Sequence, residues 1–254
     1  SHANAGEATN GRTEGHPQTS SDDLRVVLPQ EKRIRLMLLA TFSTGIIDAI
    51  GYLGFDKVFT ANMTGNVIIL GMGLAGNHSL PVIGPLLALM SFFLGAMLAG
   101  AILRSEPAGW TNRVGHVFTT EASLVSVTGI LIWLFPISDH GPALMYAYTV
   151  VLALLLGGQA AAARHVAVKD VTTVVVTSTI TGLASESRLA GGDGSLSLRR
   201  FLALAALTLG AIIAGFLPPY GSVHRDALGV LATAATLMLA SWLGRRWLNA
   251  ENPR

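Results

Sequence analysis

One carboxylate lies inside an apolar stretch of the chain. Asp48 is flanked by the uncharged, largely apolar residues 36–47 and 49–55. An acidic side chain near the centre of a membrane helix costs about 2.5–3.5 kcal/mol on insertion scales, so such residues normally face a cavity or a partner. A carboxyl placed there could take up and release protons during a transport cycle. The alternative is that Asp48 lies close enough to the membrane surface to be hydrated.

Polar side chains crowd the short stretch that follows. On a helix, Thr60 and Thr64 share one face, and Asn62 and Asn66 share another. Such hydroxyls and amides could replace part of a solute's hydration shell, or they could tie helices together at roughly 0.6 kcal/mol per hydrogen bond. We predict that Asp48, Asn62, Thr64 and Asn66 form one polar cluster on a substrate or ion pathway.

A second polar stretch offers only threonines. Thr173, Thr177 and Thr181 would form one stripe on a helix. Threonine is a weaker signal than asparagine, because its hydroxyl can bond a carbonyl of its own helix. We expect Thr177 and Thr181 to line the pathway from the second half of the chain.

Four further charged residues have predicted roles. Asp56 and Asp170 each precede a helix-like run, and aspartate is a favoured N-cap, so we predict that both cap short helices. Glu121 and Arg164 are candidates for buried charges that pair with each other. Alternatively, Arg164 anchors a helix end at the inner membrane surface and Glu121 lies at that interface.

Composition limits the class of protein. Hydrophobic residues make up 51% of the chain and charged residues 13%, about half the charged share of soluble domains. Lys and Arg (17) nearly balance Asp and Glu (15), which argues against nucleic acid as a partner. Motifs of hydrolases, metalloproteases and nucleotide-binding enzymes are missing. Cysteine is absent and no two histidines have metal-ligand spacing, so we expect no catalytic residues, cofactor or metal.

The apolar stretches must position these polar residues. Eight hydrophobic segments are long and lack the charged face of a soluble amphipathic helix; they comprise residues 34–54, 58–75, 80–103, 114–135, 142–163, 171–185, 201–217 and 227–247. A spanning helix needs about 20 apolar residues. Residues 171–185 provide about 22 Å of helix at ~1.5 Å per residue, which is too short for a hydrocarbon core of ~30 Å.

The distribution of positive charge selects a topology. If all eight segments cross, eight Lys and Arg face the cytoplasm and six face outward. If the second and sixth segments enter and leave on one side, the numbers become twelve and two. The positive-inside rule prefers the second arrangement. We therefore predict an all-α membrane protein with six transmembrane helices, two short broken or re-entrant segments and both termini in the cytoplasm.

The two halves of the sequence resemble each other. Gly95, Ala99 and Gly100 align with Gly210, Ala214 and Gly215 at an offset of 115, and Thr64-Gly65 aligns with Thr181-Gly182 at an offset of 117. Three spans per half would place the second half upside down, as two inverted-topology repeats, an architecture common among transporters. The small residues also permit close helix packing, within one chain or between the copies of a homo-oligomer.

Residues 45–71, GIIDAIGYLGFDKVFTANMTGNVIILG, and 157–184, GGQAAAARHVAVKDVTTVVVTSTITGLA, resemble the signature regions of the YoaK family. The resemblance covers about residues 33–246. It implies a six-span protein of the bacterial inner membrane, and it supplies no established substrate or reaction.

These observations lead to one prediction for the whole chain. Residues 1–30 form a disordered tail, residues 31–248 a single membrane domain with repeats at about 34–135 and 142–247, and residues 249–254 a C-terminal tail. The partners expected are the lipid bilayer and an unknown small solute. The function predicted is a small-solute transporter or permease, with proton coupling as an option. The alternatives are a membrane-embedded enzyme acting on lipid or quinone, and a structural or signalling membrane protein.

Overall fold

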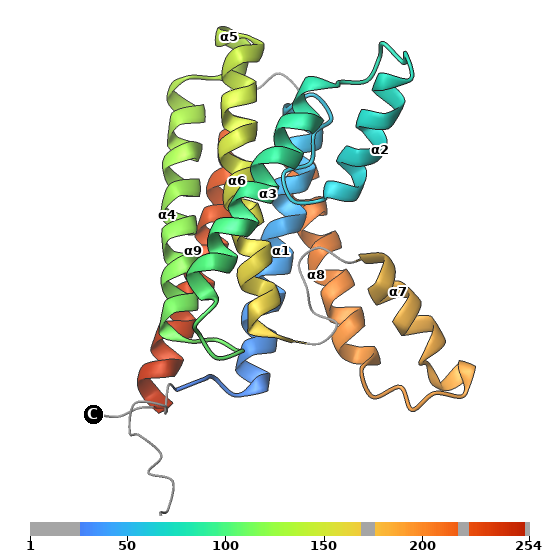
Figure 1. Cartoon of the computed structure of the whole chain (residues 1–254), viewed down its shortest axis with the longest axis vertical. Helices are drawn as coiled ribbons and strands as arrows, with labels where there is room; N and C mark the ends of the chain where they lie inside the picture. Colours follow the sequence, from blue (N-terminus) through green and yellow to red (C-terminus); the bar gives the residue numbers. More distant parts are fainter. Residues whose placement is uncertain (1–25, 169–175, 218–223, 252–254) are drawn as a thin grey trace, which may run out of the picture.

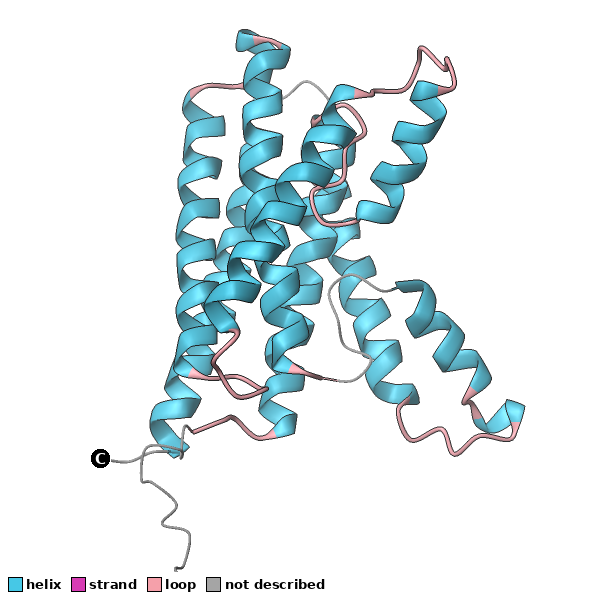
Figure 2. Ribbon diagram, in the orientation of Figure 1, coloured by secondary structure: helices cyan, strands magenta, loops and turns pink. Residues whose placement is uncertain are grey.

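The computed structural model describes residues 26–168, 176–217 and 224–251. In these ranges the regular structure is entirely helical (Figure 2). The helices are α1 (Gln30–Gly54), α2 (Met63–Leu74), α3 (Ile83–Leu103), α4 (Asn112–Leu134), α5 (Ile137–His140), α6 (Pro142–Val166), α7 (Val176–Ser185), the 3-10 turn η1 (Arg188–Ala190), α8 (Ser197–Phe216) and α9 (Arg225–Glu251).

Six of these helices are long and apolar enough to cross a membrane: α1, α3, α4, α6, α8 and α9. A backbone in lipid must satisfy its polar groups internally, which long uncharged segments achieve as helices. Helix α2 has 12 residues, about 18 Å of rise, and falls short of the bilayer core. The predicted all-α membrane fold with six spanning helices is therefore confirmed.

Pairs of helices from the two halves of the chain pack together. Helix α3 packs along α6 and α1 along α8, while α4 packs along α9. The short helices lie outside this bundle, α2 against α3 and α7 against α8. Figure 1 shows both starting near mid-height, with α2 running toward the end that carries α5 and α7 toward the end that carries the C-terminus.

Glycines bring the paired helices into close contact. An added Cβ at Gly95 would overlap the carbonyl oxygen of Leu154, and one at Gly157 would overlap that of Phe92. The α1–α8 pair is built the same way, with Gly45 against the Leu207 carbonyl and Gly210 against the Phe42 carbonyl. Small residues at these crossings let the two backbones touch.

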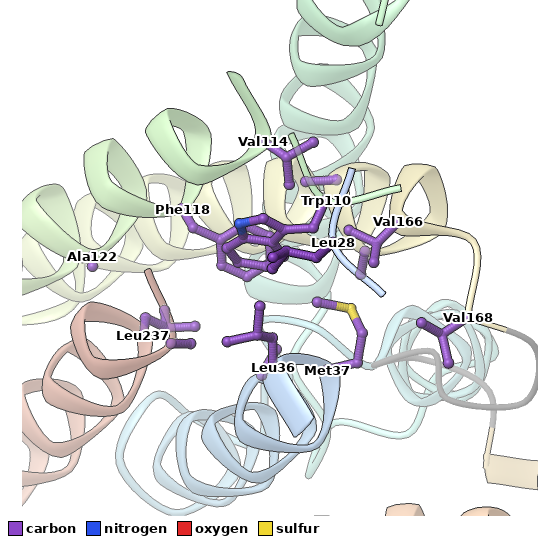
Figure 3. Close-up of a cluster of buried hydrophobic side chains, with 14 of the residues drawn as sticks. Leu28, Leu36, Met37, Trp110, Val114, Phe118, Ala122, Val166, Val168 and Leu237 are labelled. Carbon is purple, nitrogen blue, oxygen red and sulfur yellow. The ribbon is translucent and has the colours of Figure 1, made fainter. Parts of the chain in front are cut away.

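A hydrophobic cluster joins α1, α4, the end of α6 and α9 (Figure 3). Trp110 packs against Phe118 with ring centroids 4.8 Å apart, and Leu28 packs into the same cluster. Leu28 is 1% exposed, and its N–H donates to the Trp110 carbonyl at 3.2 Å. Val26 and Leu28, which fall within the predicted tail of residues 1–30, pack on the bundle.

The start of α1 lies beside the end of α9. Lys32 Nζ lies 2.6 Å from Oε1 of Glu251, the last residue of α9. Both ends of the membrane domain consequently lie at the same end of the bundle.

Candidate functional site

Asp48 holds the backbone of the segment that precedes α2. Its Oδ1 accepts hydrogen bonds from the N–H of Thr60 at 3.0 Å and of Ala61 at 2.7 Å. The side chain is half-buried on α1. The carboxylate thus fixes non-helical backbone against a spanning helix.

Two asparagines complete this local structure. Asn66 is fully buried; its Oδ1 accepts from the Phe59 N–H at 2.9 Å and its Nδ2 donates to the Phe59 carbonyl at 2.7 Å. The Asn62 side chain caps α2 by accepting from the Gly65 N–H at 3.3 Å. Asp48, Asn62 and Asn66 therefore act together on residues 59–66, as backbone anchors.

A cavity of about 340 Å³ opens beside Asp48. Its walls come from α1, from the segment before α2 and from α8. They include Asp48, Tyr52, Phe59, Asn62, Leu207 and Ala211. The cavity is mainly apolar, with one carboxylate and one amide among its polar groups.

Two aromatic rings form one side of this cavity. Tyr52 and Phe59 stack with ring centroids 5.2 Å apart and an interplanar angle of 29°. Gly65 lies behind Phe59, since a Cβ on this glycine would overlap the ring. The Gly of the first Thr-Gly motif thus leaves the space that the Phe59 ring occupies.

Thr64, predicted in the polar cluster, and Asp56, predicted as a helix cap, have different positions from those expected. Thr64 is exposed on α2 and is not part of the cavity wall. Asp56 does not cap α2: it lies in a turn with φ 52°, whereas N-cap residues take extended backbone. Because α2 begins only at Met63, the predicted helical faces through Thr60 and Asn62 do not form.

The second half has a different polar arrangement. Thr177 and Thr181 are exposed on α7, and they do not line the cavity at Asp48. Helix α7 is held to α8 by Arg200, whose Nη1 donates to the Gly182 carbonyl at 2.7 Å and whose Nη2 lies 2.9 Å from Glu186 Oε2. Asp170 and Thr173 lie outside the described residues.

Glu121 lies at a different cavity, of about 310 Å³, between α3, α4 and α6. Its side chain is 4% exposed, and neither carboxylate oxygen has a hydrogen-bond partner among the described residues. Arg164 is exposed near the end of α6 and forms no ion pair with Glu121, so the predicted pair does not form. Asp48 and Glu121 border separate cavities and do not converge as an acid–base pair would.

The sequence did not indicate the aromatic wall. Tyr52 and Phe59 are seven residues apart and meet only because the chain reverses after α1. The capping role of Asn62 had a signal, since asparagine directly before an apolar helical run is a common helix start.

The comparisons with known proteins point to one family. The model of "Protein of unknown function (DUF1275)" matches residues 36–242. The UPF0700 transmembrane protein YoaK of Bacillus subtilis (strain 168) is 28% identical over 155 residues, which cover 61% of this chain and 67% of that protein. No solved structure matches the chain.

Proposed function

Because the chain belongs to the family of unknown function DUF1275, as its YoaK-like segments predicted, we propose an activity from the site itself. The protein is a multi-pass membrane protein, and in our proposal it transports a small solute with Asp48 as the proton-coupling group. One observation carries the proposal: Asp48 borders a cavity and also holds the segment that leads into a helix too short to span.

The backbone of residues 59–62, which leads into α2, is not helical. Non-helical backbone at membrane depth survives only when it is buried in protein or faces a wet cavity. Here two of its amides donate to Asp48. Hydrogen bonds to a charged acceptor contribute about 1.5–3 kcal/mol, against about 1 kcal/mol for neutral pairs. Protonation of Asp48 would therefore loosen this segment and let the cavity change shape.

The coupling requires that proton binding occur at Asp48. Among the described residues that form the cavity wall, Asp48 has the one carboxylic acid group. On the neighbouring α9, Asp226 lies against the backbone of Gly54, beyond this wall. Asp48 is therefore the group that we propose exchanges protons with the cavity.

We also propose that the halves are inverted repeats that alternate access to the site. The support comes from the glycines at which two paired helices touch, because their positions match between the halves. The contact of Gly95 with the Leu154 carbonyl corresponds to the contact of Gly210 with the Phe42 carbonyl. The two glycines are 115 residues apart in the sequence and the two carbonyl residues 112. The exchange of α1 for α6, α3 for α8 and α4 for α9 leaves the pattern of packed helix pairs unchanged. In such transporters, sites lie at interrupted helices and one half rocks against the other.

The proposed location is the bacterial inner membrane with both termini in the cytoplasm. Of the Lys and Arg residues that the structure describes, only Lys57 and Arg225 lie at the end of the bundle opposite the termini. Positive charge collects on the cytoplasmic side of such proteins.

The test is solute-dependent proton movement in proteoliposomes that contain a pH-sensitive dye. Wild-type protein is challenged with a panel of small amines, sugars, amino acids and carboxylates. We expect at least one solute to move protons, and Asp48→Asn to abolish that movement while the variant still folds. Asp139→Asn, at an exposed position between spans, is the control and should behave as wild type. Equal proton movement by Asp48→Asn would refute the proposal.

A further inference from the structure

We infer that the solute bound beside Asp48 is a small organic cation, a protonated or quaternary amine with an apolar body. The inference rests on the proposed function, because it names the substrate class of the same cavity. The charge of the cavity wall, its aromatic face and its scarcity of oxygen ligands all favour such a ligand.

The cavity carries a negative charge without a cation in its wall. Its described lining contains the Asp48 carboxylate and no Lys, Arg or His. The nearest lysine in the sequence, Lys57, is turned elsewhere, since its Nζ donates to the Ser79 carbonyl at 3.0 Å. Asp48 Oδ1 accepts hydrogen bonds from the backbone amides of Thr60 and Ala61, and a carboxylate can accept about four hydrogen bonds. The site therefore favours a ligand that brings a positive charge and N–H donors.

An anionic ligand is the competing possibility, because the start of a helix attracts negative charge. Several amides before and in the first turn of α2 are already used. Those of Thr60 and Ala61 donate to Asp48, and that of Gly65 donates to Asn62. An anion would also be repelled by Asp48, so this helix start does not form an anion site.

The aromatic pair matches the apolar part of an amine. Tyr52 and Phe59 stack in the wall that contains Asp48, and aromatic faces attract ammonium groups within about 6 Å. Gly65 acts as a positioning residue, since it leaves room for the Phe59 ring. Leu53, Leu207 and Ala211 provide apolar contact for the remainder of the ligand.

A bare metal ion fits this wall poorly. Hard cations require about six or more oxygen ligands, and the described lining offers one carboxylate, one side-chain amide and one phenol. A volume of about 340 Å³ is in the range of small-molecule sites. Organic cations are therefore the class that the site accommodates.

The experiment measures equilibrium binding to the purified full chain in detergent, by calorimetry. Benzylamine, cyclohexylamine and phenethyltrimethylammonium are compared with the neutral benzyl alcohol and the anionic benzoate. We expect one or more of the cations to bind. The uncharged and the anionic analogue should each bind at least about tenfold more weakly, because each lacks one charge-assisted hydrogen bond to Asp48.

Three variants locate the ligand. Asp48→Asn should weaken cation binding by about tenfold or more, and Phe59→Leu by roughly threefold or more. Gly65→Ala should also weaken binding, because the added methyl group displaces the Phe59 ring. Glu121→Gln, at the other cavity, is the matched control and should bind as wild type. Circular dichroism confirms that each variant is folded.

The outcomes separate the inference from the proposed function. If none of the cations binds, or benzoate and benzyl alcohol bind equally well, the cation inference is wrong. Asp48-dependent movement of some other solute would in that case leave the transport proposal intact. If the cations bind at Asp48 but no panel solute is moved in proteoliposomes, the transport proposal is wrong and the cation site remains.

Discussion

Asp48 links the cavity to the backbone because a single carboxylate oxygen accepts two amide hydrogen bonds. Two neighbouring asparagines also bind this backbone. The Asn66 side chain is hydrogen-bonded to the backbone N–H and carbonyl of Phe59, and Asn62 caps α2. A substitution here therefore changes both the charge of the cavity and the position of its aromatic wall. Stability and ligand binding must be measured separately for each variant.

The first prediction compares two substitutions of Asp48. Asp48→Ala removes the acceptor of two amides, and each buried group left unpaired costs about 1–3 kcal/mol. Asp48→Asn keeps an acceptor oxygen in nearly the same place. We expect thermal unfolding in detergent to show a clearly lower midpoint for Asp48→Ala than for Asp48→Asn. Equal midpoints would mean that the carboxylate does not support residues 60–61.

The second prediction concerns Glu121. This carboxyl group is buried, and both of its oxygens lack a hydrogen-bond partner within the described structure. Burying such a polar group costs about 1–3 kcal/mol by protein mutational data. Glu121→Leu should therefore raise the thermal midpoint, with Glu121→Gln as the polar control of similar shape. A lower midpoint for the leucine variant would reveal a stabilising partner of Glu121 in the folded protein.

At the scale of helices, the glycine crossings fix how closely α3 approaches α6 and α8 approaches α1. The short helices lack this kind of support from the bundle. Each packs mainly on one long helix, and α7 depends on the buried Arg200 for its attachment to α8. The long pairs are thus the most extensively packed part of the described structure, and α2 and α7 are attached to it less extensively.

The third prediction uses glycines at matched positions. Gly95→Ala and Gly210→Ala would push a methyl group into a facing backbone carbonyl, and overpacking typically costs about 1–3 kcal/mol. At Gly100 and Gly215 nothing lies within 4 Å of an added Cβ. Alanine there should be tolerated, or stabilising by about 0.5–1 kcal/mol through its better helix propensity.

The measurement is the thermal midpoint of each variant in detergent. If Gly100→Ala and Gly215→Ala are as destabilising as the crossing variants, these glycines are buried in solution. The homo-oligomer that the small-residue pattern allows would then be the first explanation to test, by cross-linking.

At the scale of the whole molecule, the sequence predicts the six spans well, because a membrane span needs only length and lack of charge. The start of α2 was less predictable. Residues 58–75 form one apolar run, and nothing in their hydropathy marks the non-helical backbone before Met63. The apolar sequence on both sides of Asp48 indicates this carboxylate as a site candidate. Tyr52 and Phe59, in contrast, meet through a chain reversal that composition does not encode.

The fourth prediction tests the topology by cysteine labelling, since the chain has no native cysteine. Asn112 is exposed at the start of α4. Asp139 is exposed in α5, which follows the other end of α4. A membrane-impermeant maleimide should label Asn112→Cys only from the cytoplasmic side and Asp139→Cys only from outside. Reversed labelling would place the termini outside the cell.

The most direct test of the account asks whether the Asp48 cavity is reached from both sides of the membrane. Ala211 lies in the cavity wall opposite Asp48's helix, on α8. If the two halves alternate access, Ala211→Cys reacts with the impermeant maleimide in right-side-out and in inside-out vesicles, and a bound amine slows both reactions. Asn112→Cys and Asp139→Cys each react from one side and report vesicle orientation. Reaction of Ala211→Cys from a single side at every pH and solute condition would contradict transport through this cavity.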